Sequence, residues 1–158
     1  MTSRSGLLIA IGIAGLTMGA APSVRAQVQY GPQLNWASNN IGFGVGGRVE
    51  ASLAKAIPSV QGLGVVGAFN VYFPTGGTAW SIDAGGTYHF DIPTVKTIAP
   101  YVGASLAVFH GVRRTGGGLN LFAGTNFSAL GALTPFAELK LVLVRSTSAF
   151  VLTGGVLF

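Results

Sequence analysis

The sequence predicts an all-β fold, an eight-stranded antiparallel up-and-down transmembrane β-barrel. Apolar residues alternate with small or polar residues along most of the chain, as they do in strands, whose successive side chains point to opposite faces. Only 8% of the residues are charged, against roughly 25% in an ordinary soluble domain. The mean hydropathy is +0.58, yet no internal run approaches the roughly 20 apolar residues of a membrane helix. Because only helices and closed barrels satisfy their backbone groups in lipid, these observations favour a membrane barrel.

The start of the chain is predicted to be an export signal. Arg4 supplies a positive start, residues 7–18 supply a short apolar core, and Val24-Arg25-Ala26 offers a small-residue cleavage site before Gln27. An uncleaved inner-membrane anchor is the alternative, but the apolar core is short for a membrane span and contains several glycines. We therefore expect a signal peptide over residues 1–26 and an outer-membrane barrel domain over residues 27–158.

The stretch from Asn40 to Leu53 shows the alternating pattern most clearly, with a row of apolar residues on one face and glycines plus one charge pair on the other. Seven further segments repeat it: Val28–Trp36, Leu63–Phe73, Ala79–Phe90, Pro100–His110, Leu119–Ser128, Pro135–Val144 and Ala149–Phe158. Each has about the 9–11 residues that a tilted strand needs to cross a bilayer. Pro32 lacks a ladder donor, so the first strand is expected to be bent or irregular there.

Large aromatic residues favour the ends of the predicted strands, which predicts an aromatic girdle at each membrane interface. One girdle would contain Trp36, Phe73, Trp80 and Phe109, and the other Tyr30, Tyr88, Phe90, Tyr101, Phe127, Phe136 and Phe158. The alternation alone also allows an inverted, soluble barrel with the apolar face inside. That face is too bulky for the interior of eight strands, which only just holds packed side chains.

The charges within the predicted strands all have the parity of the small polar face, and they are Arg48, Glu50, Asp83, Glu138 and Lys140. We expect them to point into the barrel as a network that satisfies a polar interior. A gated pore or a proton path is the alternative. An eight-stranded barrel is too narrow for an open aqueous channel, so the structural interpretation is favoured.

No motif in the sequence predicts catalysis, a metal or a cofactor. Gly42, Gly44 and Gly47 match a dinucleotide-binding spacing, but that motif needs a helix after the strand, and here the strand continues. The two histidines, His89 and His110, are expected at opposite ends of the barrel and therefore not in one metal site. There are no cysteines, and the basic residues are too scattered for a nucleic-acid surface.

Three arginines fall in predicted outer loops: Arg113, Arg114 and Arg145. They are candidate contacts for lipopolysaccharide phosphates, because guanidinium groups bind phosphate in a bidentate way. Ordinary loop solubility is the alternative explanation.

The chain resembles the small outer-membrane barrel family typified by the OmpA transmembrane domain and OmpX. The resemblance rests on the Ala26-Gln27 end of the signal, on Pro100-Tyr101-Val102-Gly103-Ala104 as a strand opening, and on a closing strand that ends at Phe158. It implies that Phe158 is part of the signal read by the barrel-assembly machinery, and that the partners are outer-membrane lipid and lipopolysaccharide. The family has long outer loops, whereas here these loops are predicted to be as short as the periplasmic turns.

From these observations we expect a monomeric, non-enzymatic outer-membrane barrel with a structural role in envelope integrity or surface lipid contact. A narrow or gated pore for small solutes is the alternative function, and a lipid A-modifying enzyme is a third possibility.

Overall fold

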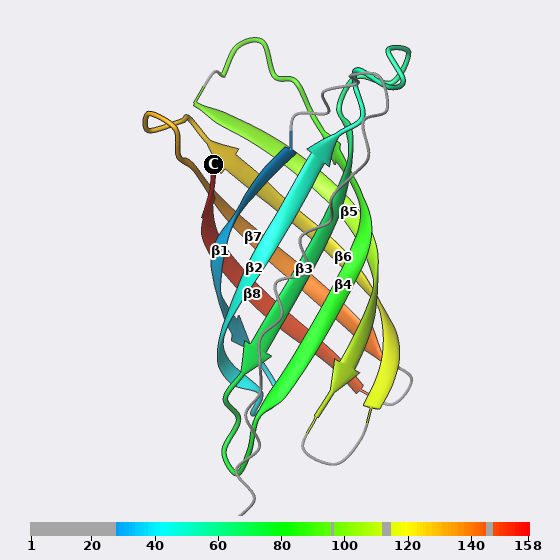
Figure 1. Cartoon of the computed structure of the whole chain (residues 1–158), viewed down its shortest axis with the longest axis vertical. Coiled ribbons are helices and arrows are strands. Elements are labelled where there is room, and N and C mark those ends of the chain that lie inside the picture. The colour runs from blue at the N-terminus through cyan, green and yellow to red at the C-terminus, as the bar shows by residue number, and fades with distance from the viewer. Residues whose placement is uncertain (1–27, 96, 112–114, 145–146) are drawn as a thin grey trace, which may run out of the picture.

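The computed structural model describes residues 28–95, 97–111, 115–144 and 147–158. The predicted signal peptide and the candidate lipopolysaccharide contacts Arg113, Arg114 and Arg145 lie outside these residues. Within the described part of the chain, eight strands close into one barrel in sequence order (Figure 1). They are β1 (Val28–Ala37), β2 (Gly42–Ser52), β3 (Leu63–Tyr72), β4 (Ala79–His89), β5 (Ile98–His110), β6 (Thr115–Phe127), β7 (Thr134–Val144) and β8 (Thr147–Leu157).

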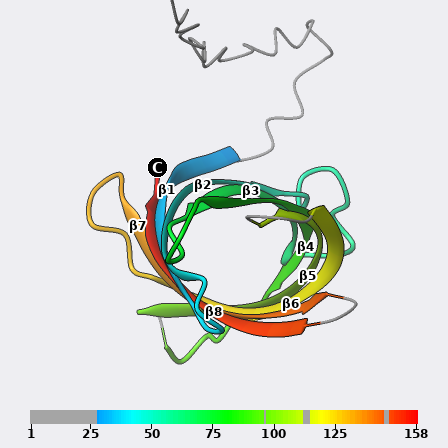
Figure 2. The same cartoon turned by 90° about the horizontal axis from the view of Figure 1, so that it is seen from below.

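Each strand pairs antiparallel with the strands before and after it, and β1 also pairs antiparallel with β8, which closes the barrel (Figure 2). The predicted all-β, up-and-down topology is therefore confirmed. We call the end of the barrel that holds Val28 and Phe158 the terminal end. The opposite end, where β1 joins β2 and β3 joins β4, is the far end. In the described residues no helix is long and apolar enough to span a membrane.

The outer surface of the barrel is apolar from strand to strand, and the lumen is polar at its centre. Leu34, Trp36 and Leu106 are 58%, 60% and 72% exposed, whereas Asn70 and Asn120 are fully buried inside. A barrel whose exterior is this apolar is suited to lipid, because alternation places every second residue of each strand against the bilayer.

Three rings expected in the girdles point into the lumen instead, and these assignments are corrected. Tyr101 and Phe136 are 1% and 3% exposed, and Phe109 packs against a buried apolar cluster inside the barrel. Their parity along the strand decides their direction, and nearness to a strand end does not override it.

Glycines on neighbouring strands provide the room for most of these inward rings. Tyr101 pairs across strands with Gly124, and Phe136 pairs with Gly155. A Cβ on Gly124 would come within 2.6 Å of the Tyr101 ring, and one on Gly155 within 2.7 Å of the Phe136 ring. Two further cross-strand pairs, Gly44 with Tyr72 and Gly103 with Phe122, show the same arrangement.

Pro32 affects the seam between β1 and β8 rather than the continuity of β1. The strand runs without a break from Val28 to Ala37. Its ladder to β8 covers residues 33–37, and backbone bonds of 3.1 and 3.0 Å join Tyr30 and Phe158 beyond the proline. The irregularity expected at Pro32 is thus confined to the hydrogen bonding of the seam, because proline has no N–H to donate.

The connections at the two ends differ in length. The terminal end has the longer ones, over residues 53–62, 90–97 and 128–133, while the far end has residues 38–41, 73–78, 111–114 and 145–146. The connections at the far end, where the outer loops are predicted, are therefore short as expected, and those at the terminal end are longer than expected. In Figure 2 the loops around residues 53–62 and 128–133 lean outward beyond the barrel wall.

Candidate functional site

The middle of the lumen is built around Asp83 on β4. Its carboxylate accepts hydrogen bonds from Asn120 at 2.8 Å, from Asn70 at 3.2 Å and from Lys140 at 3.4 Å. Asn120 and Lys140 lie on β6 and β7, which are not neighbours of β4 in the sheet. A hydrogen bond between strands that do not pair must cross the lumen, so this group bridges the interior.

Asn70 on β3 extends the same layer toward β1. Its side-chain oxygen accepts hydrogen bonds from Gln33 at 2.6 Å and Asn35 at 2.9 Å, and its amide donates to Ser81 at 3.2 Å. Thr153 on β8 donates to Asn35 at 2.8 Å. Polar side chains from β1, β3, β4 and β8 therefore hydrogen-bond to one another in this layer, as buried polar groups usually do. Among the described residues, the Gln33 Oε1 atom is left without a hydrogen-bond partner.

A second layer, nearer the terminal end, contains an ion pair that crosses the lumen. The Arg48 guanidinium on β2 contacts Glu138 on β7 at 2.6 Å and Glu50 on its own strand at 3.2 Å. The Tyr101 hydroxyl donates to Glu138 at 3.0 Å. The Arg48 guanidinium also lies 5.4 and 5.0 Å from the ring centres of Tyr101 and Phe136, within the range of a cation–π interaction.

The charged groups of the two layers are joined. Lys140 lies 3.4 Å from Asp83 and 3.9 Å from Glu138. The structure thus brings all five of the predicted interior charges together in one buried network, in which each has an oppositely charged neighbour. We call this group the lumenal network; its charged members are Arg48, Glu50, Asp83, Glu138 and Lys140.

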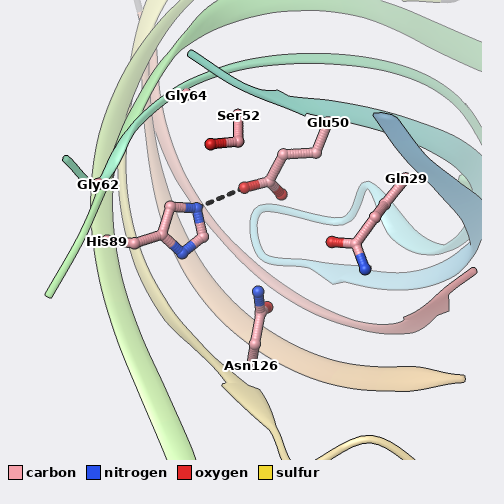
Figure 3. A pocket seen from close by; sticks show the side chains of 7 residues that line it. All are labelled: Gln29, Glu50, Ser52, Gly62, Gly64, His89 and Asn126. Atoms are coloured by element: carbon pink, nitrogen blue, oxygen red, sulfur yellow. Dashed lines mark hydrogen bonds and ion pairs between the residues drawn. The ribbon is translucent and has the colours of Figure 1, made fainter. Parts of the chain in front are cut away.

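At the terminal end the lumen widens into a polar mouth of about 200 Å³ (Figure 3). The Nε2 atom of His89 lies 2.5 Å from the Glu50 carboxylate, and the side chains of Gln29 and Asn126 extend into the same space. Ser52, Gly62 and Gly64 complete the lining. The polar mouth is therefore bounded by groups that bind water and polar solutes, and it ends at the lumenal network.

The histidine and serine positions do not resemble a hydrolytic centre. His110 lies at the far end, where it is hydrogen-bonded to Thr115 at 2.7 Å and its ring stacks on Trp80. Ser81 is fully buried beside Asn70, away from His89 at the opposite end of β4. In the part of the chain that the structure describes, no three Asp, Glu or His side chains are placed to hold a metal ion.

Sequence reasoning missed several members of the site. The contact of His89 with Glu50 joins β4 to β2, two strands away, and no local pattern predicts it. Tyr101 and Phe136 were assigned to the girdles. The glycines opposite them were the available signal, because a ring and a glycine side by side on one face suggest mutual packing.

Comparison with known proteins relates the chain to membrane barrels by structure alone. No protein-family model and no curated protein sequence matches it. Neisserial surface protein A superposes with a TM-score of 0.54 at 21% identity, over 82% of this chain and 94% of that one. The N-terminal β-barrel domain of Pseudomonas aeruginosa OprF gives 0.57 at 20% identity, over 85% and 98%. A transmembrane β-barrel designed de novo gives 0.62 at 12% identity, over 83% and 92%.

These likenesses show the fold. The chain has the architecture of the small eight-stranded outer-membrane barrels, in agreement with the resemblance to the OmpA transmembrane domain and OmpX.

Proposed function

We propose that the protein resides in the outer membrane as a barrel closed by its own side chains, with a structural role in envelope integrity or surface lipid contact. The observation that supports it is the lumenal network. Arg48 and Glu138 belong to β2 and β7, so their 2.6 Å contact runs across the interior. Asp83 and Lys140, on β4 and β7, cross it a second time.

The burial of the network favours a plug over a conduction path. Arg48, Glu138 and Lys140 are 4%, 2% and 6% exposed. An ion moving along the lumen would have to break contacts between charges that have already left water, and each charge left unpaired in a dry interior is costly. The pore alternative therefore requires the network to open, and the polar mouth alone does not provide a path.

Two features support the proposed setting in the outer membrane. The apolar exterior suits lipid, and Phe158 lies at the seam that closes the barrel. Its backbone bonds with Tyr30 complete the seam, and its ring packs edge-on against the Tyr30 ring at 4.7 Å. Binding of lipopolysaccharide by Arg113, Arg114 and Arg145 is part of the proposal and rests on the sequence.

Conductance across a planar lipid bilayer tests the closed lumen. The purified protein is expected to insert without producing current steps at neutral pH. The variant carrying both Arg48→Ser and Glu138→Ser removes the crossing pair and serves as the matched comparison, for which we expect more current than for the wild type. Steady, reproducible steps from the wild type would establish the pore instead. An altered lipid A mass in cells that express the protein would point to the enzyme.

The structural role is tested in the native host. Cells that lack the gene are expected to become sensitive to a large antibiotic that an intact outer membrane excludes, and the wild-type gene should restore resistance. Unchanged sensitivity in the deletion strain would contradict a role in envelope integrity.

A further inference from the structure

The far end of the lumen holds a cavity of different chemistry from the polar mouth. Its volume is about 190 Å³, and its walls are apolar. Tyr72, Phe109, Val142 and Val151 supply the larger side chains, and Ala37 and Ala149 supply small ones. We call this space the apolar chamber. It lies inside the barrel, because its walls have the inward parity of their strands.

The apolar chamber is separated from the polar layer by one step along the strands. On β8 the inward residues Ala149 and Val151 are followed by Thr153, which is hydrogen-bonded to Asn35. On β1 the inward residue Asn35 has Ala37 as the next inward residue. The lumen therefore changes from polar side chains that hydrogen-bond to one another to aliphatic and aromatic ones within two residues. Among the described lining residues, the Tyr72 hydroxyl is the one side-chain group of the chamber that would bind water.

The chamber has room because its alanines are small. A close-packed interior leaves few voids larger than a water molecule. Here Ala37, Ala79 and Ala149 occupy positions at which larger aliphatic side chains would fill the space. Fully enclosed cavities of about 150 Å³ lined by such groups stay dry and bind ring-sized hydrocarbons, because water finds too few partners there. The apolar chamber is only partly enclosed, and its walls likewise offer water few partners. An apolar guest would lose its contact with water and gain contact with the surrounding side chains.

We propose that the apolar chamber is a binding site for a small uncharged hydrocarbon group, about the size of a single aromatic ring or a short length of alkyl chain. This goes beyond the structural role proposed above, since a plug needs only the lumenal network. The same chemistry is offered by a free hydrocarbon and by the alkyl end of a lipid molecule, and the experiment distinguishes these two sources.

Methyl NMR in lipid nanodiscs tests the site. The protein, expressed with its full sequence, is labelled at valine, leucine and alanine methyl groups. In one sample toluene is added to fully deuterated lipid, and in the other the lipid tails are protonated and no toluene is present. Magnetisation transfer from toluene to Val142 and Val151 supports a free hydrocarbon as the guest. Transfer from lipid tails to these methyl groups supports the lipid. Transfer from neither, or from water alone, overturns the proposal.

Filling the chamber provides the specific control. Ala149→Leu is expected to abolish transfer to Val142 and Val151 while leaving the lipid contacts of the outward Leu152 unchanged. Ala37→Leu fills the chamber from another strand and replaces the first variant if that one does not fold. Ala123→Leu adds the same side chain on the lipid-facing side of β6 and should leave transfer to the chamber intact. Transfer that persists in a folded filled variant would show that the guest lies elsewhere.

Discussion

Arg48→Met is expected to destabilise the barrel more than Glu138→Gln does, although the two residues form one ion pair. Among the described lumenal residues, Arg48 and Lys140 face three acids, Glu50, Asp83 and Glu138. Removing Arg48 leaves one cation against three carboxylates. Removing the charge of Glu138 leaves two cations and two carboxylates.

The expected loss in the free energy of unfolding follows from the contacts that each substitution removes. Arg48→Met removes the closest cation from the carboxylate of Glu138, which is 2% exposed and keeps only the Tyr101 hydroxyl and Lys140 at 3.9 Å. Breaking a buried pair in this way costs about 3–5 kcal/mol. In Glu138→Gln the new amide oxygen can still accept hydrogen bonds from Arg48 and Tyr101, so we expect a loss nearer to 1–3 kcal/mol, roughly the cost of weakened buried hydrogen bonds. The double variant should lose less than the sum of the two single losses, by about 0.5–3 kcal/mol for residues in contact.

Urea unfolding in lipid vesicles measures these differences, with the free energy of unfolding taken by linear extrapolation. Val45→Met places the same new side chain on the lipid-facing side of β2, at a position 39% exposed, and should change stability by no more than about 0.5 kcal/mol. If Glu138→Gln costs as much as Arg48→Met, the reasoning from charge balance is wrong. Strict additivity in the double variant would mean that the pair does not act as a unit.

Two further substitutions test the seam and the lipid face. Gly31→Ala should lower the temperature at which the barrel unfolds on a heat-modifiability gel, because its Cβ would overlap the Val156 carbonyl oxygen at 1.8 Å. Gly154→Ala is the neutral control, since the nearest atom to its Cβ is 3.9 Å away. Equal unfolding temperatures of the two variants would refute the steric argument. Leu106→Arg should cost about 2–4 kcal/mol in vesicles if this 72% exposed position meets the bilayer core, and an unchanged or raised stability would mean that it faces water.

Much of the fold could be predicted from the sequence because its determinants are local. A period of two residues is visible within each strand, and over Asn40–Leu53 it correctly indicates one apolar face and one face of small and charged residues. The same parity placed Asp83 and its four charged companions on the lumen side. None of this requires knowledge of how the strands align with one another.

The partners inside the lumen could not be predicted, because they depend on strand alignment. Strands in a closed barrel are tilted and staggered. The sequence therefore does not reveal which residues of different strands lie at the same level along the barrel axis. The Glu50–His89 contact joins strands separated by β3, and Arg48 reaches Glu138 across the interior. The interior cavities were missed for the same reason, since each is lined by residues from several strands.

The glycine–aromatic pairs of the lumen have a consequence for how such a chain can change over time. Tyr101 with Gly124, and Phe136 with Gly155, share one volume, so neither partner can grow unless the other shrinks and, for the glycine, the nearby backbone carbonyl of Ala137 or Pro32 also moves. Outward positions face no such condition, because lipid accepts almost any apolar side chain. Substitutions in related barrels should therefore be coupled across hydrogen-bonded neighbours inside and independent of one another outside. The sequences of two such barrels can therefore diverge almost completely on the lipid-facing surface while the summed volume of each paired set of lumenal side chains stays the same.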